Sequence, residues 1–279
     1  MKPWNKYFVT SEYQKWPEAT SLCSQDCQKM VEFRMRSDKD FNKSSFFSLT
    51  FEQGPRRYKY YHQYLRQHLK PHEHGLSIGS GLCINELKLQ EEGYDILCTD
   101  IKNNWDGLLS PFFPDFRFQE LDIVHSVYPK PQDYVIALSV LFFFDKMDAI
   151  KIFNNVAKSL NPRGRFILDL GGGEDNLWTT VLDNFFCPWD SYLQFLIKKN
   201  LLRKKVVFYK KHQGYRYTNR DVIDLARQSG FRLDHFYATD YVTELKDRLL
   251  LFSRLPEKVI ALLGRSMPYV RLFNFVKEE

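Results

Sequence analysis

The sequence predicts an α/β protein built around a doubly wound, largely parallel sheet. Between residues 74 and 171, short β-rich runs alternate with helical stretches, a pattern typical of βαβ units. One run, residues 133–139, is almost wholly apolar, as expected of a central strand buried on both faces. Hydrophobic residues make up 44% and charged residues 27% of the 279 residues. This balance is typical of a folded globular chain and argues against wholesale disorder.

The strands and helices can be placed in order along the chain from periodicity and from stop signals such as Pro71 and Gly93. Strands are expected at 75–78, 94–99, 116–119, 133–139, 165–170, 231–242 and 270–276. Helices are expected near 17–36, 56–69, 82–92, 146–160, 175–186 and 190–203, from Thr218 or Asn219 to 229, and over most of 244–264. Residues 161–164 are expected to form a turn before the fifth strand.

Two segments lie outside this alternation. Residues 1–70 are polar, aromatic and irregular, so we expect an N-terminal helical extension ahead of a main domain spanning 71–279. Residues 174–213 interrupt the main domain and follow the carboxyl end of a strand, so we expect them to form a helical cap over a substrate. Six aromatic residues of this cap are candidates for an acceptor pocket, with an ordinary core stripe as the equal alternative: Trp178, Phe185, Phe186, Trp189, Tyr192 and Phe195.

The positive charge is concentrated in one segment. Lys and Arg number 40 against 34 Asp and Glu, a net charge of +6. Residues 191–220 contain Lys198, Lys199, Arg203, Lys204, Lys205, Lys210, Lys211, Arg216 and Arg220, and no acid. Such a segment suits phosphates or an anionic membrane surface. A solvated face is the alternative of about equal weight.

Cysteine and histidine usage favours a reduced compartment and no metal. The cysteines are odd in number and sparse, so we expect free thiols and a cytoplasmic location. Cys23 and Cys27 are four apart but lack a second pair, which favours buried thiols over zinc ligands. Four histidines gather around Pro71, which breaks their helix, and no acid or cysteine accompanies them: His62, His68, His72 and His74. No secretory signal and no apolar stretch of about 18 residues is found.

The first chemical signal is a glycine turn between a strand and a helix. Gly79-Ser80-Gly81 follows the strand at 75–78, and such a turn exposes backbone N–H groups and lets a ligand approach closely. Asp100 ends the next strand, 19 residues after Gly81 (100 − 81). A carboxylate at that point can accept hydrogen bonds from both hydroxyls of a ribose. The pair therefore indicates an adenosine-type cofactor at the carboxyl ends of the strands.

The rest of the turn narrows the choice of cofactor. A dinucleotide fingerprint requires a third glycine where this chain has Ile84, which counts against NAD and FAD. No Gly-x-x-x-x-Gly-Lys-Ser/Thr run occurs, so the sequence has no P-loop.

With these features the sequence resembles the class I S-adenosylmethionine-dependent methyltransferases over roughly residues 74–279. The resemblance is carried by Leu76–Gly81, Asp100, Asp122, the strand Asp133–Ser139, the turn in Leu160–Phe166, and the late helix ending at Ser229-Gly230-Phe231. It implies a Rossmann-like, seven-stranded sheet with a reversed last strand, S-adenosyl-L-methionine as the cofactor, and methyl transfer as the reaction. It also implies a cofactor site made of Gly79, Ser80, Gly81, Asp100, Ile101, Asp122, Ile123 and Ser139. Asp122 resembles the acid that lies beside the adenine amino group.

Three departures from the family pattern bear on chemistry. Ser77 stands where many members carry an acid, and Cys83 where many carry a third glycine. The stretch 139–143 offers no acid or imidazole after the fourth strand, so the catalytic group is unassigned. Four residues are candidates for a general base by position alone: Glu174, Asp175, His125 and His212.

The leading functional reading is a methyltransferase for a small or medium acceptor of the glycan or metabolite type, with an anionic acceptor as one form of it. An RNA methyltransferase that uses residues 198–220 on phosphates is the alternative. A methyltransferase-fold binding protein without catalytic activity is a third reading, motivated by the altered glycine motif.

Overall fold

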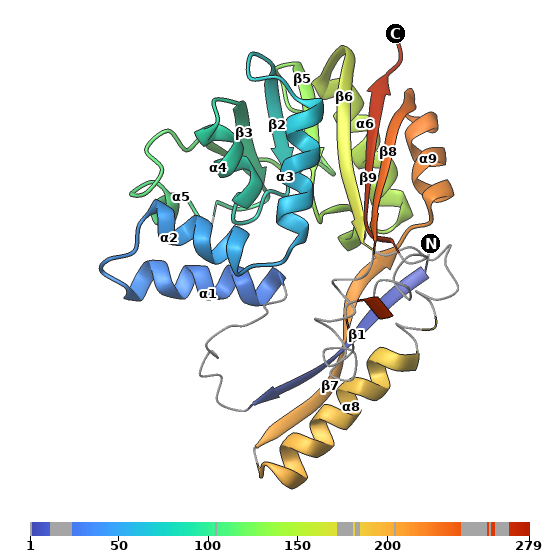
Figure 1. Ribbon diagram of the computed structural model, residues 1–279. Helices are drawn as coiled ribbons and strands as arrows, with labels where there is room; N and C mark the ends of the chain where they lie inside the picture. The colour runs from blue at the N-terminus through green and yellow to red at the C-terminus, as the bar shows by residue number, and fades with distance from the viewer. Residues whose placement is uncertain are drawn as a thin grey trace.

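The main body of the molecule is a seven-stranded sheet with helices on both faces (Figure 1). The strand order is β4-β3-β2-β5-β6-β9-β8, and the first five of these strands run parallel. The strands are β2 (His74–Ile78), β3 (Asp95–Asp100), β4 (Phe118–Glu120), β5 (Gln132–Ala137), β6 (Leu160–Gly171), β8 (Phe231–Asp240) and β9 (Pro268–Lys277). The computed structural model describes residues 2–11, 24–103, 105–171, 181, 185–203, 205–240, 256, 258–259 and 268–279.

The last strand is reversed, as predicted. β9 runs antiparallel to both of its neighbours, β6 and β8. The Rossmann-like, doubly wound class with a reversed last strand is therefore confirmed.

Successive side chains of the central strand β5 point alternately into two separate hydrophobic cores. On β5, Tyr134 and Ile136 enter the core beneath α3 and α4, whereas Val135 and Ala137 enter the core beneath α6 and α9. All four side chains are buried. Because successive side chains of a strand point to opposite faces, a strand covered on both sides reads as a continuous apolar run.

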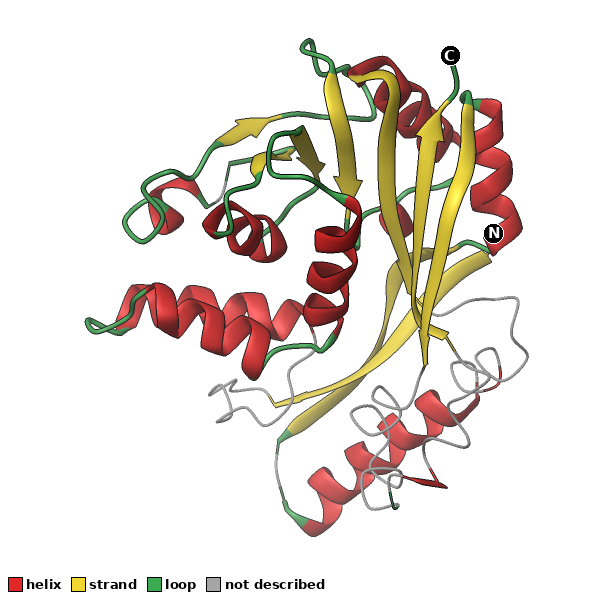
Figure 2. Ribbon diagram, turned by 45° about the horizontal axis from the view of Figure 1, so that its top comes forward, coloured by secondary structure: helices red, strands yellow, loops and turns green. Residues whose placement is uncertain are grey.

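The helices cover the two faces unequally, as Figure 2 shows from a second angle. One face carries α3 (Arg57–His68), α4 (Ile84–Glu91) and α5 (Asp106–Leu109), with α1 (Ser24–Ser37), α2 (Lys43–Phe47) and the π-helical turn η1 (Ser48–Glu52) packed beside them. The other face carries α6 (Lys146–Ser159) and α9 (Asn219–Gln228). Thr218 caps α9 in a capping box with Asp221, which decides between the two predicted caps.

A second, two-stranded sheet was not predicted. β1 (Lys2–Ser11) pairs antiparallel with β7 (Val206–Arg216), and α8 (Cys187–Leu196) with the turn η4 (Ile197–Leu201) packs against it. Figure 1 shows these elements projecting from the main sheet; we call β1, β7, α8 and η4 the appended lobe. The N-terminal extension is thus not helical throughout, and the predicted helical cap at 174–213 ends in a strand. The physical reason is pairing between segments about 200 residues apart, which local periodicity does not register.

Other boundaries differ in smaller ways. The predicted turn at 161–164 lies inside β6, where Arg163 has a φ of 63° and the register against β5 shifts. Most of the predicted helix at 175–186 and most of the one at 244–264 lie outside the described residues. Within the described part of the chain, no helix combines the length and apolar composition that crossing a membrane requires. The division into domains at residue 70 stays a prediction.

Candidate functional site

The glycine turn forms at the carboxyl end of β2, at the edge of the sheet where the parallel strands end. Gly79 and Gly81 have φ values of 61° and 51°, which glycine adopts without the strain of a Cβ. A Cβ at Gly79 would lie 2.7 Å from Val140. The Ser80 N–H donates to the Thr99 carbonyl at 3.0 Å, so the turn is tied to β3. This carboxyl edge therefore presents a short, tightly held run of backbone.

Asp100 meets the glycine turn directly. Its Oδ2 accepts a hydrogen bond from the Gly81 N–H at 3.0 Å, and its Oδ1 accepts one from the Ile101 N–H at 2.8 Å. Each carboxylate oxygen keeps a second lone pair, and the side chain is half-buried rather than sealed. Beside it the Ile101 side chain is 65% exposed. The arrangement suits a ligand with a vicinal diol and a flat apolar ring.

Cys83, at the position of the third glycine in the family pattern, has a backbone conformation that favours glycine. Its φ is 53°, in the left-handed region, which explains why a glycine is expected at this position. Its side chain is fully buried, with Sγ 3.3 Å from the Ser80 Oγ and 3.4 Å from the Gly81 carbonyl oxygen. The thiol therefore turns inward under the loop.

A buried acid lies beneath the loop, on the helix rather than on the strand. The Ser77 Oγ donates to the Glu86 Oε1 at 2.6 Å, and both residues are buried. Burial raises the pKa of the Glu86 carboxyl, against the opposing effect of the Ser77 hydrogen bond. The acid missing at position 77 thus has a counterpart at position 86, which we did not predict. The sequence gives no clear signal for it, because α4 also contains Lys88 and Glu91 and only the fold shows that Glu86 is buried.

Asp122 follows β4 and is held by the turn that comes after it. Its Oδ1 accepts from the Val124 N–H at 3.0 Å, and its Oδ2 lies 2.8 Å from the His125 Nδ1. The hydrogen bond from His125 lowers the pKa of the Asp122 carboxyl, against a smaller effect of burial. His125, a candidate base, is therefore paired with a predicted cofactor residue. Ile123, next in the chain, is buried in the core on the α6 side.

Ser139 follows β5 and belongs to a buried polar cluster with Tyr61 and Asp169. The Ser139 N–H donates to the Asp169 Oδ1, and the Tyr61 hydroxyl donates to the Asp169 Oδ2 at 2.5 Å. The Tyr61 and Ser139 hydroxyl oxygens are 3.2 Å apart. Burial raises the pKa of both the Asp169 carboxyl and the Tyr61 phenol. This cluster holds Ser139 at a φ of 59°.

Tyr61 and Asp169 were both missed in the sequence. Asp169 interrupts the apolar run of β6, which is the signal that marks a buried acid with a function or a partner. Tyr61 gives no comparable signal, because α3 contains several tyrosines and only the fold shows which one is fully buried.

The appended lobe is joined to the carboxyl edge through β7. A Cβ at Gly214 would lie 2.0 Å from the Phe142 carbonyl oxygen in the short helix η2 (Leu141–Phe143). Three residues further on, the buried Tyr217 donates its hydroxyl hydrogen to the Phe144 carbonyl at 2.7 Å. This close approach puts the inner end of β7 beside the segment that follows Ser139.

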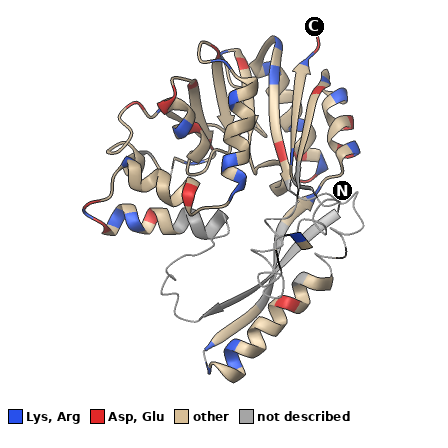
Figure 3. Ribbon diagram, viewed as in Figure 1, with Lys and Arg blue, Asp and Glu red and all other residues tan. Residues whose placement is uncertain are grey.

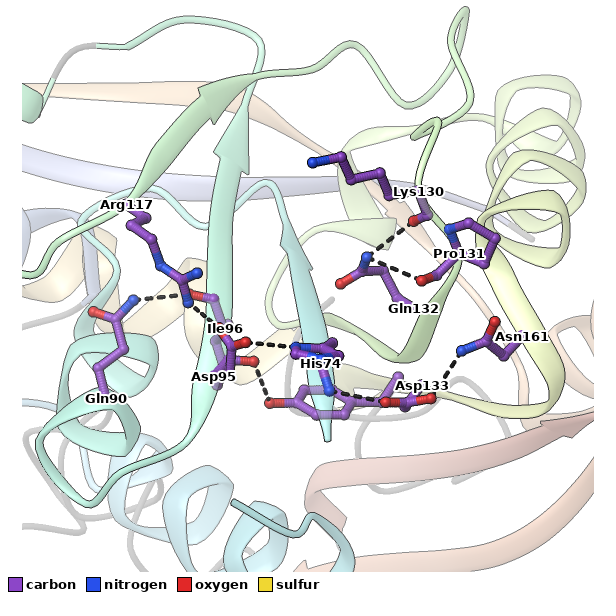
Figure 4. A network of polar contacts seen from close by, with 11 residues as sticks. His74, Gln90, Asp95, Ile96, Arg117, Lys130, Pro131, Gln132, Asp133 and Asn161 are labelled. Atoms are coloured by element: carbon purple, nitrogen blue, oxygen red, sulfur yellow. Dashed lines mark hydrogen bonds and ion pairs between the residues drawn. The ribbon is translucent and has the colours of Figure 1, made fainter. Parts of the chain in front are cut away.

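The opposite edge of the sheet, at the amino ends of the parallel strands, is closed by its own polar network (Figure 4). The Asp95 carboxylate lies 2.6 Å from the His74 Nδ1 and also pairs with Arg117. The Asp133 carboxylate accepts from the His74 N–H at 2.9 Å and from Asn161 at 2.8 Å. These side chains form hydrogen bonds and ion pairs with one another, as expected at the edge of an α/β sheet that does not bind the ligand.

The histidines near Pro71 have separate partners. His62 Nε2 lies 3.0 Å from Glu92, and His68 Nδ1 lies 2.8 Å from the Tyr64 carbonyl oxygen. In the part of the chain that the structure describes, no three His, Cys, Asp or Glu side chains are grouped as metal ligands.

The other candidate bases are not brought into the site by the described structure. Glu174 and Asp175 lie outside the described residues. His212 lies in β7, opposite Asn5 of β1. Of the candidate cap aromatics, Trp178 is also outside the described residues, whereas Phe185, Phe186, Trp189 and Tyr192 are exposed on the appended lobe.

Several solved structures have a fold similar to that of most of this chain. Magnesium protoporphyrin IX methyltransferase from Synechocystis PCC 6803, crystallised with bound SAH, superposes with a TM-score of 0.53 at 15% identity over 90% of this chain and 94% of its own. An S-adenosylmethionine-dependent methyltransferase from Methanosarcina mazei gives 0.53 at 16% identity over 77% and 97%. A glycopeptide N-methyltransferase bound to sinefungin gives 0.51 at 11% identity over 79% and 93%.

This chain has the class I S-adenosylmethionine-dependent methyltransferase fold. Neither a protein-family model nor the sequence of a curated protein matches it. At these identities the likeness concerns the fold, and the function has to be argued from the site.

Proposed function

We propose that this protein is an S-adenosylmethionine-dependent methyltransferase. The observation that carries the proposal is the hydrogen bond between the Asp100 carboxylate and the Gly81 N–H, at 3.0 Å. It joins the glycine turn and the strand-end acid into one site at the carboxyl edge of the sheet, where ligands of open α/β sheets bind. The neighbours with the same fold include methyltransferases crystallised with SAH and with SAM, which supports this choice of cofactor.

The residues of this edge fit the proposed cofactor. We assign the ribose hydroxyls to Asp100, the face of the adenine to Ile101, and the adenine amino group to Asp122. Gly79, Ser80 and Gly81 leave room for the amino-acid end, because Cys83 turns its side chain away from the ligand side. Ile123 and Ser139 complete the site from the neighbouring strands.

The chain's own contribution to the reaction is placement. Bound S-adenosylmethionine supplies a methyl group already activated on a sulfonium, so catalysis depends on aligning the acceptor in a dry pocket. We propose that the segment after Ser139 and the inner end of β7 form the acceptor side, because the contact between Gly214 and Phe142 packs them together. No described residue is assigned as a general base.

For the acceptor we propose a small or medium molecule of the glycan or metabolite type, which includes anionic ones. The neighbours with this fold include a magnesium protoporphyrin IX methyltransferase and a glycopeptide N-methyltransferase, so the fold does not select among acceptors. We propose a cytoplasmic location, in keeping with the free, buried thiols of Cys83 and Cys98.

Isothermal calorimetry with two ligands tests the proposal. We expect S-adenosylmethionine to bind saturably and NAD to give no heat above dilution, because the third dinucleotide glycine is absent. Binding of NAD at micromolar strength without a response to S-adenosylmethionine would overturn the assignment. Adding candidate glycans to the loaded protein and measuring release of S-adenosylhomocysteine then separates an enzyme from an inactive binding protein.

A further inference from the structure

The outer side of the appended lobe carries a row of exposed apolar side chains. Trp189 is 61% exposed and Leu201 is 77% exposed. The other members of this row are also exposed: Phe185, Phe186, Tyr192, Leu193, Leu202 and Val207. We call these eight residues the apolar row. They lie along adjoining segments, from just before α8 through α8 and η4 to the start of β7. Scattered exposed hydrophobics are ordinary, but such a set in adjoining segments marks an interaction surface.

The aromatic side chains of the apolar row contact one another. The ring centroids of Phe185 and Trp189 are 6.4 Å apart, and those of Trp189 and Tyr192 are 6.5 Å apart. Tyr192 in turn contacts Phe208 of β7 at 5.7 Å. The rings therefore form one connected surface that spans α8 and β7.

The helix α8 has apolar residues on two sides. Tyr192 and Phe195 contact Phe208 of β7, and Asp190 is buried and accepts a hydrogen bond from the Gln194 side chain at 2.7 Å. Trp189 and Leu193 are exposed. One side of the helix therefore covers the small sheet, and the exposed Trp189 and Leu193 leave room for an apolar partner on the outer side.

Basic side chains border the apolar row. Lys199, Arg203 and Lys205 are exposed at the end of η4 and the start of β7, and the Lys199 Nζ lies 5.3 Å from the centre of the Phe195 ring. No acid occurs between residues 191 and 220. Figure 3 shows basic positions at the end of α8 that lies farthest from the main sheet. The tip of the lobe is thus both apolar and positively charged.

We propose that the apolar row, with the basic side chains at its outer end, binds the surface of an anionic phospholipid bilayer. Aromatic rings at the interface, aliphatic side chains inserted below it and lysines at the headgroups are the composition that suits such binding. Each Lys or Arg near an anionic surface adds attraction that salt screens. The proposed contact is with the bilayer surface.

The same observations favour lipid over other partners. RNA would use the positive charges and could stack on the rings, but it has no use for Leu193, Leu201, Leu202 or Val207. A second copy of this chain would bring a second set of lysines against the first, and like charges facing one another oppose association.

The proposal does not depend on methyl transfer. The apolar row and its basic border lie just before α8, on α8 and η4, and at the outer end of β7, whereas the cofactor residues lie at or after the ends of β2, β3, β4 and β5. Loss of cofactor binding in one variant and loss of vesicle binding in another are therefore separate results.

Vesicle flotation with the full chain tests the proposal. The probes are vesicles of equal parts phosphatidylcholine and phosphatidylglycerol, and vesicles of phosphatidylcholine alone. We expect the protein to float with the anionic vesicles, to bind the neutral ones at least about tenfold more weakly, and to be released as salt rises. Trp189 should shift its fluorescence to shorter wavelength on binding, and Trp189→Phe should lose this shift while still floating.

Matched variants separate the two parts of the surface. Trp189→Ser with Leu193→Ser, and separately Lys198→Gln with Lys199→Gln and Lys205→Gln, should each weaken binding about tenfold or more. The controls are Met147→Ser, which is 66% exposed on α6, and the exposed lysines changed in Lys39→Gln, Lys59→Gln and Lys158→Gln. These controls should float like the wild type, and circular dichroism confirms that each variant is folded.

Three results would overturn the proposal. One is no flotation with anionic vesicles by a folded wild-type protein. Another is vesicle binding that the apolar variant keeps in full, which would leave only charge as the cause. The third is a concentration-dependent dimer, seen by light scattering without lipid, that the apolar variant abolishes.

Discussion

The carboxyl edge of the main sheet and the appended lobe expose opposite kinds of side chain. At the carboxyl edge, Asp100 and Asp122 are open to solvent in part and are held by backbone N–H donors. On the appended lobe, Asp190 is buried while Trp189 and Leu201 are exposed. The first region suits a polar ligand, and the second suits the bilayer surface that we propose for it.

The difference concerns two proposed binding surfaces of different origin. The carboxyl edge arises from connections that are short in sequence: Asp100 is the last residue of β3, and Asp122 follows β4 by two residues. The lobe arises from the pairing of residues 2–11 with residues 206–216. Among the described residues, β7 packs against the main body where Gly214 passes Phe142, so changes at that point and on either side of it test how separate the two regions are.

The largest effect is expected at the junction itself. Gly214→Ala should destabilise the protein by roughly 2–4 kcal/mol, because φ is +134° and the added Cβ would overlap the Phe142 carbonyl. Denaturant-induced unfolding measures the change. Gly93→Ala is the matched control: φ is +88° but nothing lies within 4 Å of its Cβ, so strain alone should cost about 1 kcal/mol. Equal losses in both variants would show that β7 does not need this close contact.

The next effect concerns the two ends of β3. Asp100→Ala should weaken S-adenosylmethionine binding by about 1–3 kcal/mol, since two charge-assisted hydrogen bonds to the ribose are lost. Asp95→Ala removes an acid from the other end of the same strand, where it pairs with His74 and Arg117, and should leave the affinity unchanged. Calorimetry on the folded variants measures both. An unchanged dissociation constant in Asp100→Ala would show that the ribose lies elsewhere.

The main sheet was predictable because its signals are local. The sequence predicts a strand at 75–78 and a helix at 146–160, and the structure has them at His74–Ile78 and Lys146–Ser159. Alternation, caps and glycine stops act over a few residues, so they can be recognised one element at a time. β1 and β7 could not be placed in this way, because each strand is stabilised by a partner about 200 residues away.

The candidate site shows the same division. Asp100 and Gly81 were predicted to share one site, and in the structure the Gly81 nitrogen lies 3.0 Å from the Asp100 Oδ2. Asp169 and Tyr61 were missed because their meeting depends on how α3 packs over β6, which no spacing along the chain records. Whether the predicted residues bind the cofactor stays a prediction that the variants test.

The buried cluster gives a smaller effect that links the extension to the main sheet. Tyr61→Phe removes the hydroxyl that donates to Asp169 at 2.5 Å and should cost about 1–2 kcal/mol of unfolding free energy, because a buried carboxyl loses a donor. Tyr64→Phe, one turn later on α3, removes a hydroxyl that lies 3.0 Å from the exposed His235 ring, where water can replace it. If Tyr64→Phe lowers the unfolding free energy as much as Tyr61→Phe does, the hydrogen bond to Asp169 stabilises the fold no more than the one to His235.

The smallest effect is a change in pH dependence beneath the glycine turn. Burial raises the pKa of the Glu86 carboxyl, so the folded protein holds this proton more tightly than the unfolded chain does. Its stabilising effect is then complete below the ordinary pKa of a glutamate and is lost as the pH rises through the raised value in the folded state.

Glu86→Gln keeps an acceptor for Ser77 at the same place but cannot ionise. We therefore expect the difference in unfolding free energy, variant minus wild type, to increase with pH over that window, in favour of the variant. Asp169, whose pKa burial also raises, is present in both proteins, so its effect cancels in the difference. Parallel pH profiles for the two proteins would show that Glu86 is ionised in the fold, and the acid beneath the loop would then carry a charge rather than a proton.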